Sequence, residues 1–536
     1  MFSEPDYHHQ EDFQVRKGKL AKIREMGIDP YPPKFAPTHH AAPLLHHYEG
    51  EAVGDSEAAA EGKTAEVAVA GRLVLFRAMG KNAFGQLQDG TGRLQVMFNR
   101  EGTQVVGFEA GEEYATPLKF IEKLVDLGDF LGVEGHLFRT GKGELTLFVK
   151  RCHLLAKSLL PLPDKHSGIV DKEVRYRKRW LDLISHSDVV TTFKTRSRIV
   201  SLLRHSLEEL GFMEVETPIL QSIYGGAAAK PFVTHLNALK HDMFLRISLE
   251  IPLKKLIVGG MERIFEIGKV FRNEGIDKTH NPEFTLVEAY AAYWDYRDVM
   301  VFMERLCERI ARELFGEPRV RYTSGDEEIV LDFTAPWKRL TMKEAIGEYA
   351  GIEVDRCSDD EMRAILKAKT PIDPDAIELA SRGVLISFLF EELAEPHLIQ
   401  PHHILDHPIE TTPLCKPHRD PKLREEGLIE RFESFILGKE ICNAYSELND
   451  PVKQRELLIE QAMRRDAGDE EANPLDEEFI EAICQGMPPT GGWGMGVDRL
   501  VMLLTGAVSI RDVLYFPMMR SEVPTEEGEQ NPLEKP

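Results

Sequence analysis

The sequence predicts an α+β protein in which a small β-barrel precedes a longer domain that mixes strands and helices. Short apolar runs separated by turn residues fill residues 63–155 and predict the barrel. Further along, a strand–loop–strand pattern at 271–284 and an apolar run at 500–504 that favours a helix predict the mixed domain. The prolines of residues 160–165 bar regular structure and predict a linker between the two parts.

The composition is typical of a globular protein outside the membrane. The 536 residues are enough for two or more domains, with 42% hydrophobic and 29% charged residues. No apolar run approaches the roughly 20 residues of a membrane helix, and the first residues lack a secretion signal. Because the six cysteines are scattered without CxxC spacing, we expect reduced thiols in a cytoplasmic protein.

The net charge of −23 argues against a general nucleic-acid binder, which is usually basic. The charge is uneven, however, because residues 63–155 contain 12 Lys and Arg against 11 Asp and Glu. A locally neutral or basic face can still meet phosphates, so charge alone does not decide between these classes.

Residues 1–62 are predicted to form a helical extension and a loop. A basic helix ending near Gly27 fits either a solvated face, which we favour, or contacts to RNA. Its basic residues are Arg16, Lys17, Lys19, Lys22 and Arg24. The paired histidines at 8–9, 39–40 and 46–47 lack partners at metal-ligand spacing, which favours surface positions over a metal site.

The barrel is predicted as a five-stranded OB-fold over residues 63–155. The turn residues 89–92 between apolar runs signal a hairpin, and later strands are expected at 130–135 and 145–149. Such barrels often bind single-stranded nucleic acid through aromatic stacking.

The remaining boundaries follow from composition. Residues 156–185 are expected to be a linker or hinge, in which the basic, aromatic stretch 175–183 fits either RNA contacts or a packed hinge helix. Residues 186–520 form the long α+β domain, and the acidic residues 521–536 a disordered tail.

Three segments of the long domain carry the chemistry. Arg272 and Glu274 are two residues apart, so on a strand they would point together into one pocket, and Phe284 on the returning strand offers a flat face for a purine. On its own this pattern also fits a buried ion pair in an ordinary sheet. The glycines of residues 491–496 permit close approach to a ligand just before Arg499. A third segment, residues 211–220, lies upstream.

Together these segments resemble motifs 2, 3 and 1 of the class II aminoacyl-tRNA synthetases. The order of parts resembles the lysyl-tRNA synthetases of bacterial type, a likeness that covers about residues 10–520. It rests on the stretches Gly225–Phe232, Arg246–Glu250, Val287–Tyr290 and Glu440–Asp450. The resemblance implies a catalytic domain built on an antiparallel sheet of six to seven strands, in a homodimer whose interface includes motif 1. It also implies ATP-dependent attachment of lysine to the 3′ end of tRNA(Lys) through a lysyl-adenylate.

The resemblance also assigns a lysine pocket. It implies that Glu447, with Tyr290 and Glu288 nearby, takes the ε-ammonium, and that Glu250 and the backbone at Gly226 take the α-ammonium. Asn443 and Arg272 would take the carboxylate. Elementary chemistry agrees, because an ammonium held away from water needs carboxylates and hydrogen-bond acceptors. The alternative is that these carboxylates form solvated faces or structural salt bridges.

For ATP, the resemblance implies an α-phosphate clamp at Arg272, with Glu274 on the adenine amino group. Phe284 and Arg499 would stack on the purine, with His280 and Asn281 near the phosphates. Glu433 and Glu440 are implied as ligands of Mg²⁺. The spacing of residues 440, 443 and 447 also fits a helix, but we predict a hairpin that turns at Gly438.

In the barrel, the resemblance implies that Phe84 stacks on an anticodon base while Arg77 and Gln95 hydrogen-bond uridine edges. The alternative for Phe84 is plain barrel core.

The sequence departs from the family pattern at Cys442, Ala444, Trp493 and Lys230, none of which removes a charge that the chemistry needs. Three rivals remain. An aspartyl- or asparaginyl-type enzyme would not suit acidic pocket residues, an enzyme that lysylates proteins would lack the barrel, and a non-catalytic paralogue would be expected to lose Arg272 or Arg499.

Overall fold

The computed structural model describes residues 4–163, 168–324 and 327–520. These residues form two compact units, 1–169 and 170–536, apart from the undescribed positions within them. The predicted tail, residues 521–536, lies outside the described residues. The domain boundaries at residues 62, 155 and 185 stay predictions. No described helix has the length and apolar character needed to cross a membrane.

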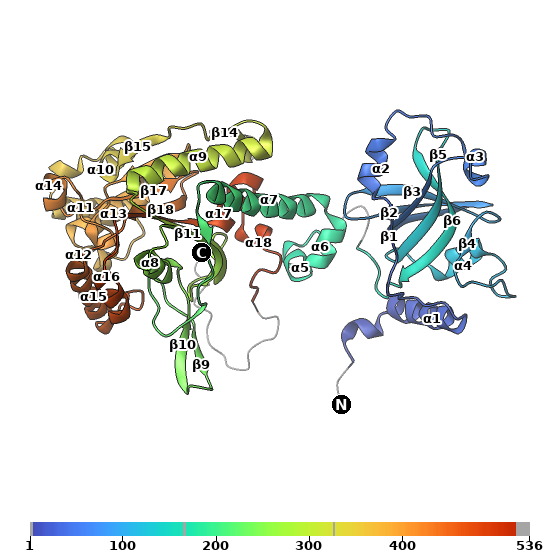
Figure 1. The fold of residues 1–536 in the computed structure, drawn as a ribbon, viewed down its shortest axis with the longest axis horizontal. Coiled ribbons are helices and arrows are strands. Elements are labelled where there is room, and N and C mark those ends of the chain that lie inside the picture. Colours follow the sequence, from blue (N-terminus) through green and yellow to red (C-terminus); the bar gives the residue numbers. More distant parts are fainter. Residues whose placement is uncertain (1–3, 164–167, 325–326, 521–536) are drawn as a thin grey trace. The chain divides into compact units, whose positions relative to one another are not determined.

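The first unit is a closed barrel with helices on its outside (Figure 1). Its described strands are β1 (Glu66–Met79), β2 (Asn82–Gln88), β3 (Arg93–Asn99), β5 (Phe130–Arg139) and β6 (Leu145–Ala156), with a two-residue strand β4 (Gln104–Val105) beside β6. The strand order is β3-β2-β1-β5-β6, and pairing of β3 with β6 closes the ring. The prediction of a five-stranded OB-type barrel is therefore confirmed.

The helices of this unit are α1 (Glu11–Glu25), α2 (Ala41–His47), α3 (Ser56–Ala60) and α4 (Pro117–Leu124). Basic residues of α1 form hydrogen bonds and ion pairs with other parts of the first unit. Arg16 donates to the carbonyls of Leu127 and Leu160, and Lys19 lies 2.5 Å from Asp126. The favoured prediction of a solvated helix face is therefore incomplete, because Arg16 and Lys19 hold α1 against the rest of the first unit.

The second unit is built on a sheet in which eight described strands have the order β15-β16-β17-β18-β19-β12-β11-β7. The strands are β7 (Met213–Glu214), β11 (Arg263–Phe271), β12 (Glu283–Ala292), β15 (Lys338–Thr341), β16 (His402–Leu405), β17 (Arg431–Phe435), β18 (Glu440–Ser446) and β19 (Thr490–Gly496). The six inner strands are antiparallel, as expected. The short edge strands β15 and β7 are parallel to their neighbours, which the expectation of six to seven antiparallel strands did not include.

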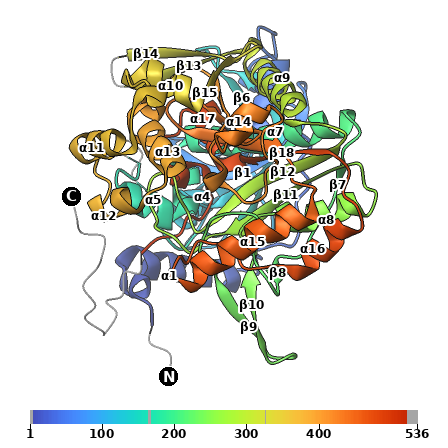
Figure 2. The same cartoon turned by 90° about the vertical axis from the view of Figure 1, so that its left-hand side faces the viewer.

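Helices cover both faces of this sheet (Figure 2). One face packs against α7 (Ser187–Glu209), α9 (Tyr296–Phe315) and α17 (Val497–Thr505), and the other against α8 (Glu250–Val258) and α16 (Glu477–Cys484). The remaining described helices are α5 (Lys172–Arg177), α6 (Arg179–Ser185), α10 (Met342–Ala345), α11 (Asp359–Lys369), α12 (Pro374–Leu379), α13 (Arg382–Leu393), α14 (Pro421–Glu425), α15 (Pro451–Asp466) and α18 (Ile510–Val513).

Two smaller sheets complete the second unit. They contain β8 (Leu220–Gln221), β9 (Val233–Leu236) and β10 (His241–Leu245) in one, and β13 (Arg319–Ser324) and β14 (Glu327–Asp332) in the other. Throughout the described chain all six cysteines are free thiols, in agreement with the expectation from their spacing.

Along β18 and β19, successive residues point alternately toward the core and toward the opposite face of the sheet, on which Phe284 lies. In β19, Trp493 and Met495 belong to the core beneath α9 and α17, whereas Gly492 and Gly494 face the other way, toward a cavity. In β18, Cys442 and Ala444 are core residues, and Asn443 lines that cavity. The period of two in a strand therefore separates packing residues from pocket residues.

Gly135, at a register shift between β5 and β6, offers a test of barrel packing. A Cβ there would lie 1.9 Å from the carbonyl oxygen of Phe148, so Gly135→Ala forces the two strands apart. We expect the free energy that protects the β5 and β6 amides from hydrogen exchange to fall by about 2 kcal/mol. The matched control is Gly141→Ala, where a Cβ meets nothing within 4 Å. Equal protection in the two variants would contradict this packing.

Candidate active site

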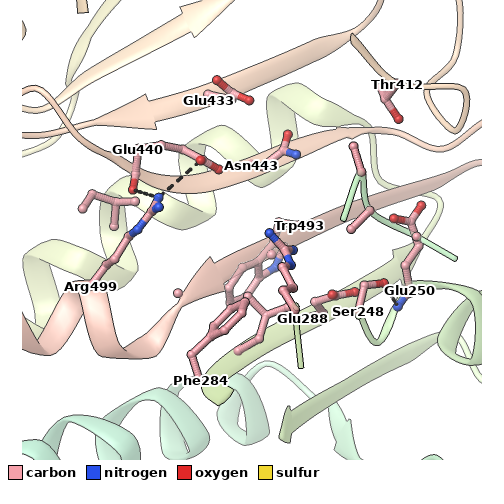
Figure 3. Close-up of a pocket in the computed structure, with 18 of the residues that line it drawn as sticks. Ser248, Glu250, Phe284, Glu288, Thr412, Glu433, Glu440, Asn443, Trp493 and Arg499 are labelled. Carbon is pink, nitrogen blue, oxygen red and sulfur yellow. Dashed lines mark hydrogen bonds and ion pairs between the residues drawn. The ribbon is translucent and has the colours of Figure 1, made fainter. Parts of the chain in front are cut away.

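A cavity of about 340 Å³ opens on the α8 face of the large sheet. Its walls come from β12, β18 and β19, the start of α8, the loop after β11 and the loop at residues 226–228 (Figure 3). All the residues predicted for lysine and ATP line it. They are Gly226, Glu250, Arg272, Glu274, His280, Asn281, Phe284, Glu288, Tyr290, Glu433, Glu440, Asn443, Glu447 and Arg499.

Three buried carboxylates meet at one end of the cavity. Glu250 begins α8, Glu288 lies on β12, and Glu447 directly follows β18. Glu288 accepts hydrogen bonds from the Leu249 amide and the Tyr290 hydroxyl, both at 3.0 Å.

Burial, together with the nearby charge of Glu250, raises the pKa of Glu288 to about 8. Burial also raises the pKa of Glu447 well above its usual range. A positively charged group at this end of the cavity would therefore be stabilised.

Two groups that the sequence analysis missed complete the acidic end. The Tyr445 hydroxyl donates to Glu250 Oε1 at 2.6 Å. Lys254, one turn after Glu250 on α8, is fully buried, with its Nζ 2.5 Å from Glu250 and paired with Glu447. Burial lowers the pKa of Lys254, but the two carboxylates outweigh it and raise that pKa to about 12. The i,i+4 spacing of Glu250 and Lys254 was the only signal in the sequence, and it is typical of surface pairs.

The backbone of β19 must be glycine where it passes this cluster. A Cβ on Gly492 would lie 1.9 Å from Glu447 Oε1 and 2.5 Å from the Tyr290 ring. Gly226, whose φ is +88°, would place a Cβ 2.1 Å from Ser248 Oγ. The absence of a side chain at these two glycines therefore lets Glu447 and Ser248 approach the backbone closely.

Arg272 and Glu274 lie just beyond the end of β11, so the prediction that they stand on the strand is wrong. The ladder continues for one bond, from the Arg272 amide to the Pro282 carbonyl at 2.9 Å, and then ends because the Asn273 amide turns to the Lys230 carbonyl. Both side chains still line the cavity, and the Arg272 guanidinium lies 5.2 Å from the centre of the Phe284 ring. Burial lowers the pKa of Arg272.

The opposite end of the cavity is lined by charged pairs. Arg499 donates to the Glu440 carbonyl at 3.0 Å, and its guanidinium lies 3.4 Å from Glu440 Oε2 (Figure 3). Arg431 pairs with Glu433 and donates to Asn443 Oδ1 at 3.0 Å. The hairpin of β17 and β18 turns at Gly438, whose φ is +62°, as predicted, and sets both glutamates at this end.

The residues at this end fit a hydrated Mg²⁺ better than a closed metal cage. Within the described chain, no group of three or more acidic, His or Cys side chains is placed to hold a metal by itself. Mg²⁺ is commonly held by one or two carboxylates plus phosphates and water, which matches Glu433 and Glu440. Burial, together with the negative charge of Glu433, raises the pKa of nearby Glu395 to about 8. This end of the cavity therefore favours a cation.

On the barrel, the three predicted nucleic-acid contacts share one outer face. Arg77 on β1 is exposed and lies directly opposite Phe84 on β2, and Gln95 on β3 donates to Thr146 at 2.8 Å. Ala83 and Leu87 point into the barrel, so Phe84 is not barrel core. It is half-buried against a small outer cluster that includes Met97 and Phe148.

Two departures from the family pattern, Trp493 and Lys230, have partners outside the acidic end of the cavity. Trp493 packs against Phe302 in the core, where the ring centres are 5.6 Å apart. Lys230 pairs with Glu470 at 2.7 Å.

Both units of the chain are similar to known proteins. Residues 171–520 match the family model described as tRNA synthetases class II (D, K and N), and residues 67–155 match the OB-fold nucleic acid binding domain. A lysine–tRNA ligase of Chlamydia pneumoniae is 57% identical over 97% of this chain and 98% of its own length. Lysine–tRNA ligases of Clostridium perfringens (45% identical; 96% of this chain, 97% of theirs) and Nostoc punctiforme (44%; 96% and 88%) are also similar. The chain therefore belongs to the lysine–tRNA ligase family of class II tRNA synthetases.

Proposed function

We propose that this protein attaches L-lysine to the 3′ end of tRNA(Lys) in two ATP-dependent steps through a lysyl-adenylate. The observation that supports this most directly is the meeting of Glu250, Glu288 and Glu447 in one buried cavity beside Arg272. Buried carboxylates left without cations are costly, and a substrate with two ammonium groups and one carboxylate supplies the missing charges. Such a pocket rejects a neutral isostere strongly, because its buried partners would stay unpaired.

Lysine would lie along the cavity with its side chain toward Glu447. The ε-ammonium would meet Glu447, with Tyr290 and Glu288 nearby, and the α-ammonium would meet Glu250 and the backbone at Gly226. Asn443 and Arg272 would hold the carboxylate. This order is supported by Arg272 and Asn443, which both line the cavity, and by Arg431, which pairs with Glu433 and donates to Asn443.

ATP would occupy the remainder of the cavity. Phe284 would stack on adenine with Arg499 on its other face, and Glu274 would accept from the adenine amino group. His280, which is held by Asp277 at 2.8 Å, and Asn281 would lie near the phosphates. Glu433 and Glu440 would hold Mg²⁺, which neutralises phosphate charge when bound.

The residues of the chain act by position and charge. Arg272 would hold the lysine carboxylate against the α-phosphorus, and its guanidinium would stabilise the negative charge that develops as pyrophosphate leaves. No side-chain nucleophile is required, because the carboxylate of lysine is itself the attacking group. The 3′-hydroxyl of tRNA would then attack the carbonyl carbon of the mixed anhydride, so that the ester forms, the hydroxyl proton is lost and AMP leaves.

The barrel would bind the tRNA anticodon, with Phe84 as the stacking platform and Arg77 and Gln95 as hydrogen-bonding partners. Their placement on one outer face supports this assignment, because a base can reach all three from the same side.

We also propose that the protein acts as a cytoplasmic homodimer. Large apolar side chains are unusually frequent on the surface of residues 210–239, which include motif 1. The exposed ones are Leu210, Met213, Ile219, Leu220, Ile223, Val233 and Leu239. A second copy that covers this surface would remove them from water.

The rivals fit less well. An aspartate or asparagine side chain offers no positive charge to the acidic end of the cavity, and aspartate would be repelled by it. The barrel separates this chain from enzymes that lysylate proteins, and the retention of Arg272, Arg499 and the three glutamates argues against a non-catalytic relative.

The proposal is tested by amino-acid-dependent ATP–pyrophosphate exchange with all twenty amino acids. Exchange with lysine alone is expected. Glu447→Gln keeps the shape but loses the charge, so the KM for lysine should rise about a hundredfold or more while the KM for ATP stays unchanged. Glu478→Gln, a surface glutamate paired with Lys255, is the matched control. Exchange driven by aspartate, or by no amino acid, would refute the proposal.

The raised pKa of Glu288 predicts a pH dependence of lysine binding. Because its pKa is about 8 in the empty pocket, the carboxyl is mostly protonated at pH 7 and must lose its proton to meet an ammonium. Lysine affinity should therefore rise as the pH increases from 6.5 to 8, by up to about tenfold per unit. Calorimetry in two buffers of different ionisation enthalpy should show proton release. Proton uptake, or none, would contradict this assignment.

Phe84→Ala should impair aminoacylation of tRNA, which depends on the barrel, without affecting lysine activation in the second unit. Loss of a stacked base costs about 1–3 kcal/mol, so kcat/KM for tRNA should fall roughly ten- to hundredfold while pyrophosphate exchange is unaffected. Phe130→Ala, at an exposed phenylalanine of the same barrel, is the control. Wild-type aminoacylation by Phe84→Ala would exclude Phe84 from anticodon binding.

A further inference from the structure

Lys254 lies behind the wall of the cavity and does not line it. Its side chain is completely buried, and its Nζ bridges Glu250 Oε1, at 2.5 Å, and Glu447 Oε2. The same Nζ lies 5.5 Å from the centre of the Tyr445 ring and 6.0 Å from that of Phe479. Because it reaches both carboxylates from the far side, Lys254 leaves their inner sides free for a ligand.

The surroundings of this ammonium are otherwise acidic or neutral. The titratable and charged groups around it come from α8, β12, the segment before α14, β18 and the residue after β18. They are Glu250, Glu288, Tyr290, Cys415, Tyr445 and Glu447. Two arginines act on the edge of this set, Arg272 on Glu288 and Arg431 on Cys415, whereas Lys254 acts on Glu250 and Glu447. The pKa of Lys254, about 12, keeps it charged throughout the working pH range.

A count of charges connects Lys254 to the substrate, on the basis of the proposed function. Three carboxylates line the acidic end of the cavity, and one resident ammonium lies behind them. When all are ionised the cluster has two negative charges left over. Lysine has two ammonium groups, and Arg272 would balance its carboxylate, so the loaded pocket would match the three carboxylates of the chain with three ammonium groups.

We propose that Lys254 is a positioning residue for lysine selection. Its ammonium holds Glu250 and Glu447 at a fixed separation with their inner oxygens toward the cavity, and it supplies the first of the three positive charges that the cluster needs. The pocket is therefore matched to a ligand with two ammonium groups, one near each of the bridged carboxylates.

The oxygen of Glu447 that does not pair with Lys254 supports this inference. Within the described structure, Glu447 Oε1 is buried and accepts no hydrogen bond. Its other close neighbours are the Gly492 backbone and the Tyr290 ring, which leave it open toward the cavity. A buried carboxylate oxygen that is held by a counter-ion on one side and unpartnered on the other is suited to accept from an incoming ammonium.

The test compares Lys254→Met with Lys255→Met on the same helix. Lys255 pairs with Glu478 at the surface, outside the pocket, so its variant controls for general effects on α8. Without the bridging charge, the pKa of Glu447 rises further above its usual range, so its carboxyl carries a proton at pH 7. Lys254→Met should therefore raise the KM for lysine about tenfold or more at pH 7, with the KM for ATP within about twofold of wild type.

The pH profile distinguishes a counter-ion from a merely structural residue. In Lys254→Met the KM for lysine should fall more steeply between pH 7 and pH 9 than in the wild type, by about a further tenfold per unit, because one additional proton must leave. A lysine KM equal to that of Lys255→Met, or a profile parallel to the wild type, would overturn the proposal.

A second measurement does not depend on the folding of a variant. A crystal structure of the wild-type protein with lysine should retain Lys254 Nζ within about 3 Å of both carboxylates. Movement of Nζ away from either one would overturn the inference. Failure of the proposed function would look different, because the wild type would then show no lysine-dependent pyrophosphate exchange.

Discussion

The burial of three carboxylates against one face of the central sheet is the constraint on which the rest of the second unit depends. Glu250, Glu288 and Glu447 come from a helix, a strand and the residue after a strand, so the sheet and α8 must both be in place before they meet. Their mutual repulsion opposes folding unless cations enter. Lys254 supplies one cation from within the chain, and under the proposed function the ammonium groups of lysine would supply the others.

The sheet accommodates these three carboxylates because one of its faces packs in the core and the other lines the cavity. Trp493 and Met495 pack beneath α9 and α17, while Gly492 and Gly494 between them give the cavity its floor. A shift of β19 by one residue would place the indole against Glu447 and expose the core. The departure from the family pattern at Trp493 is thus absorbed by packing, and the pocket is unaffected because the indole points to the other side.

Turn residues between short apolar runs were sufficient to predict the barrel, because they mark strand ends locally. The antiparallel sheet and most of the residues that line the cavity were instead implied by the resemblance to a known family. Prediction failed where tertiary contacts decide. Arg272 left its strand because a backbone bond from Asn273 to Lys230 diverts the chain. Lys254 was missed because a lysine four residues after a glutamate usually lies on a surface, and only the packing of α8 against β18 and α16 buries it.

The acidity of the chain bears on how tRNA is recognised. Residues 63–155 of the barrel contain 12 Lys and Arg against 11 Asp and Glu, a net charge of +1, so the rest of the chain has a net charge of −24. Long-range attraction of phosphates is therefore weak, and a uniformly basic surface does not bring the nucleic acid in. Under the proposed function, recognition would depend on short-range contacts such as stacking on a half-buried aromatic ring, which every base can provide, and hydrogen bonds to base edges, which only some bases satisfy. In an acidic protein these contacts determine selectivity with little competition from non-specific binding, because the electrostatic contribution common to all RNA sequences is small.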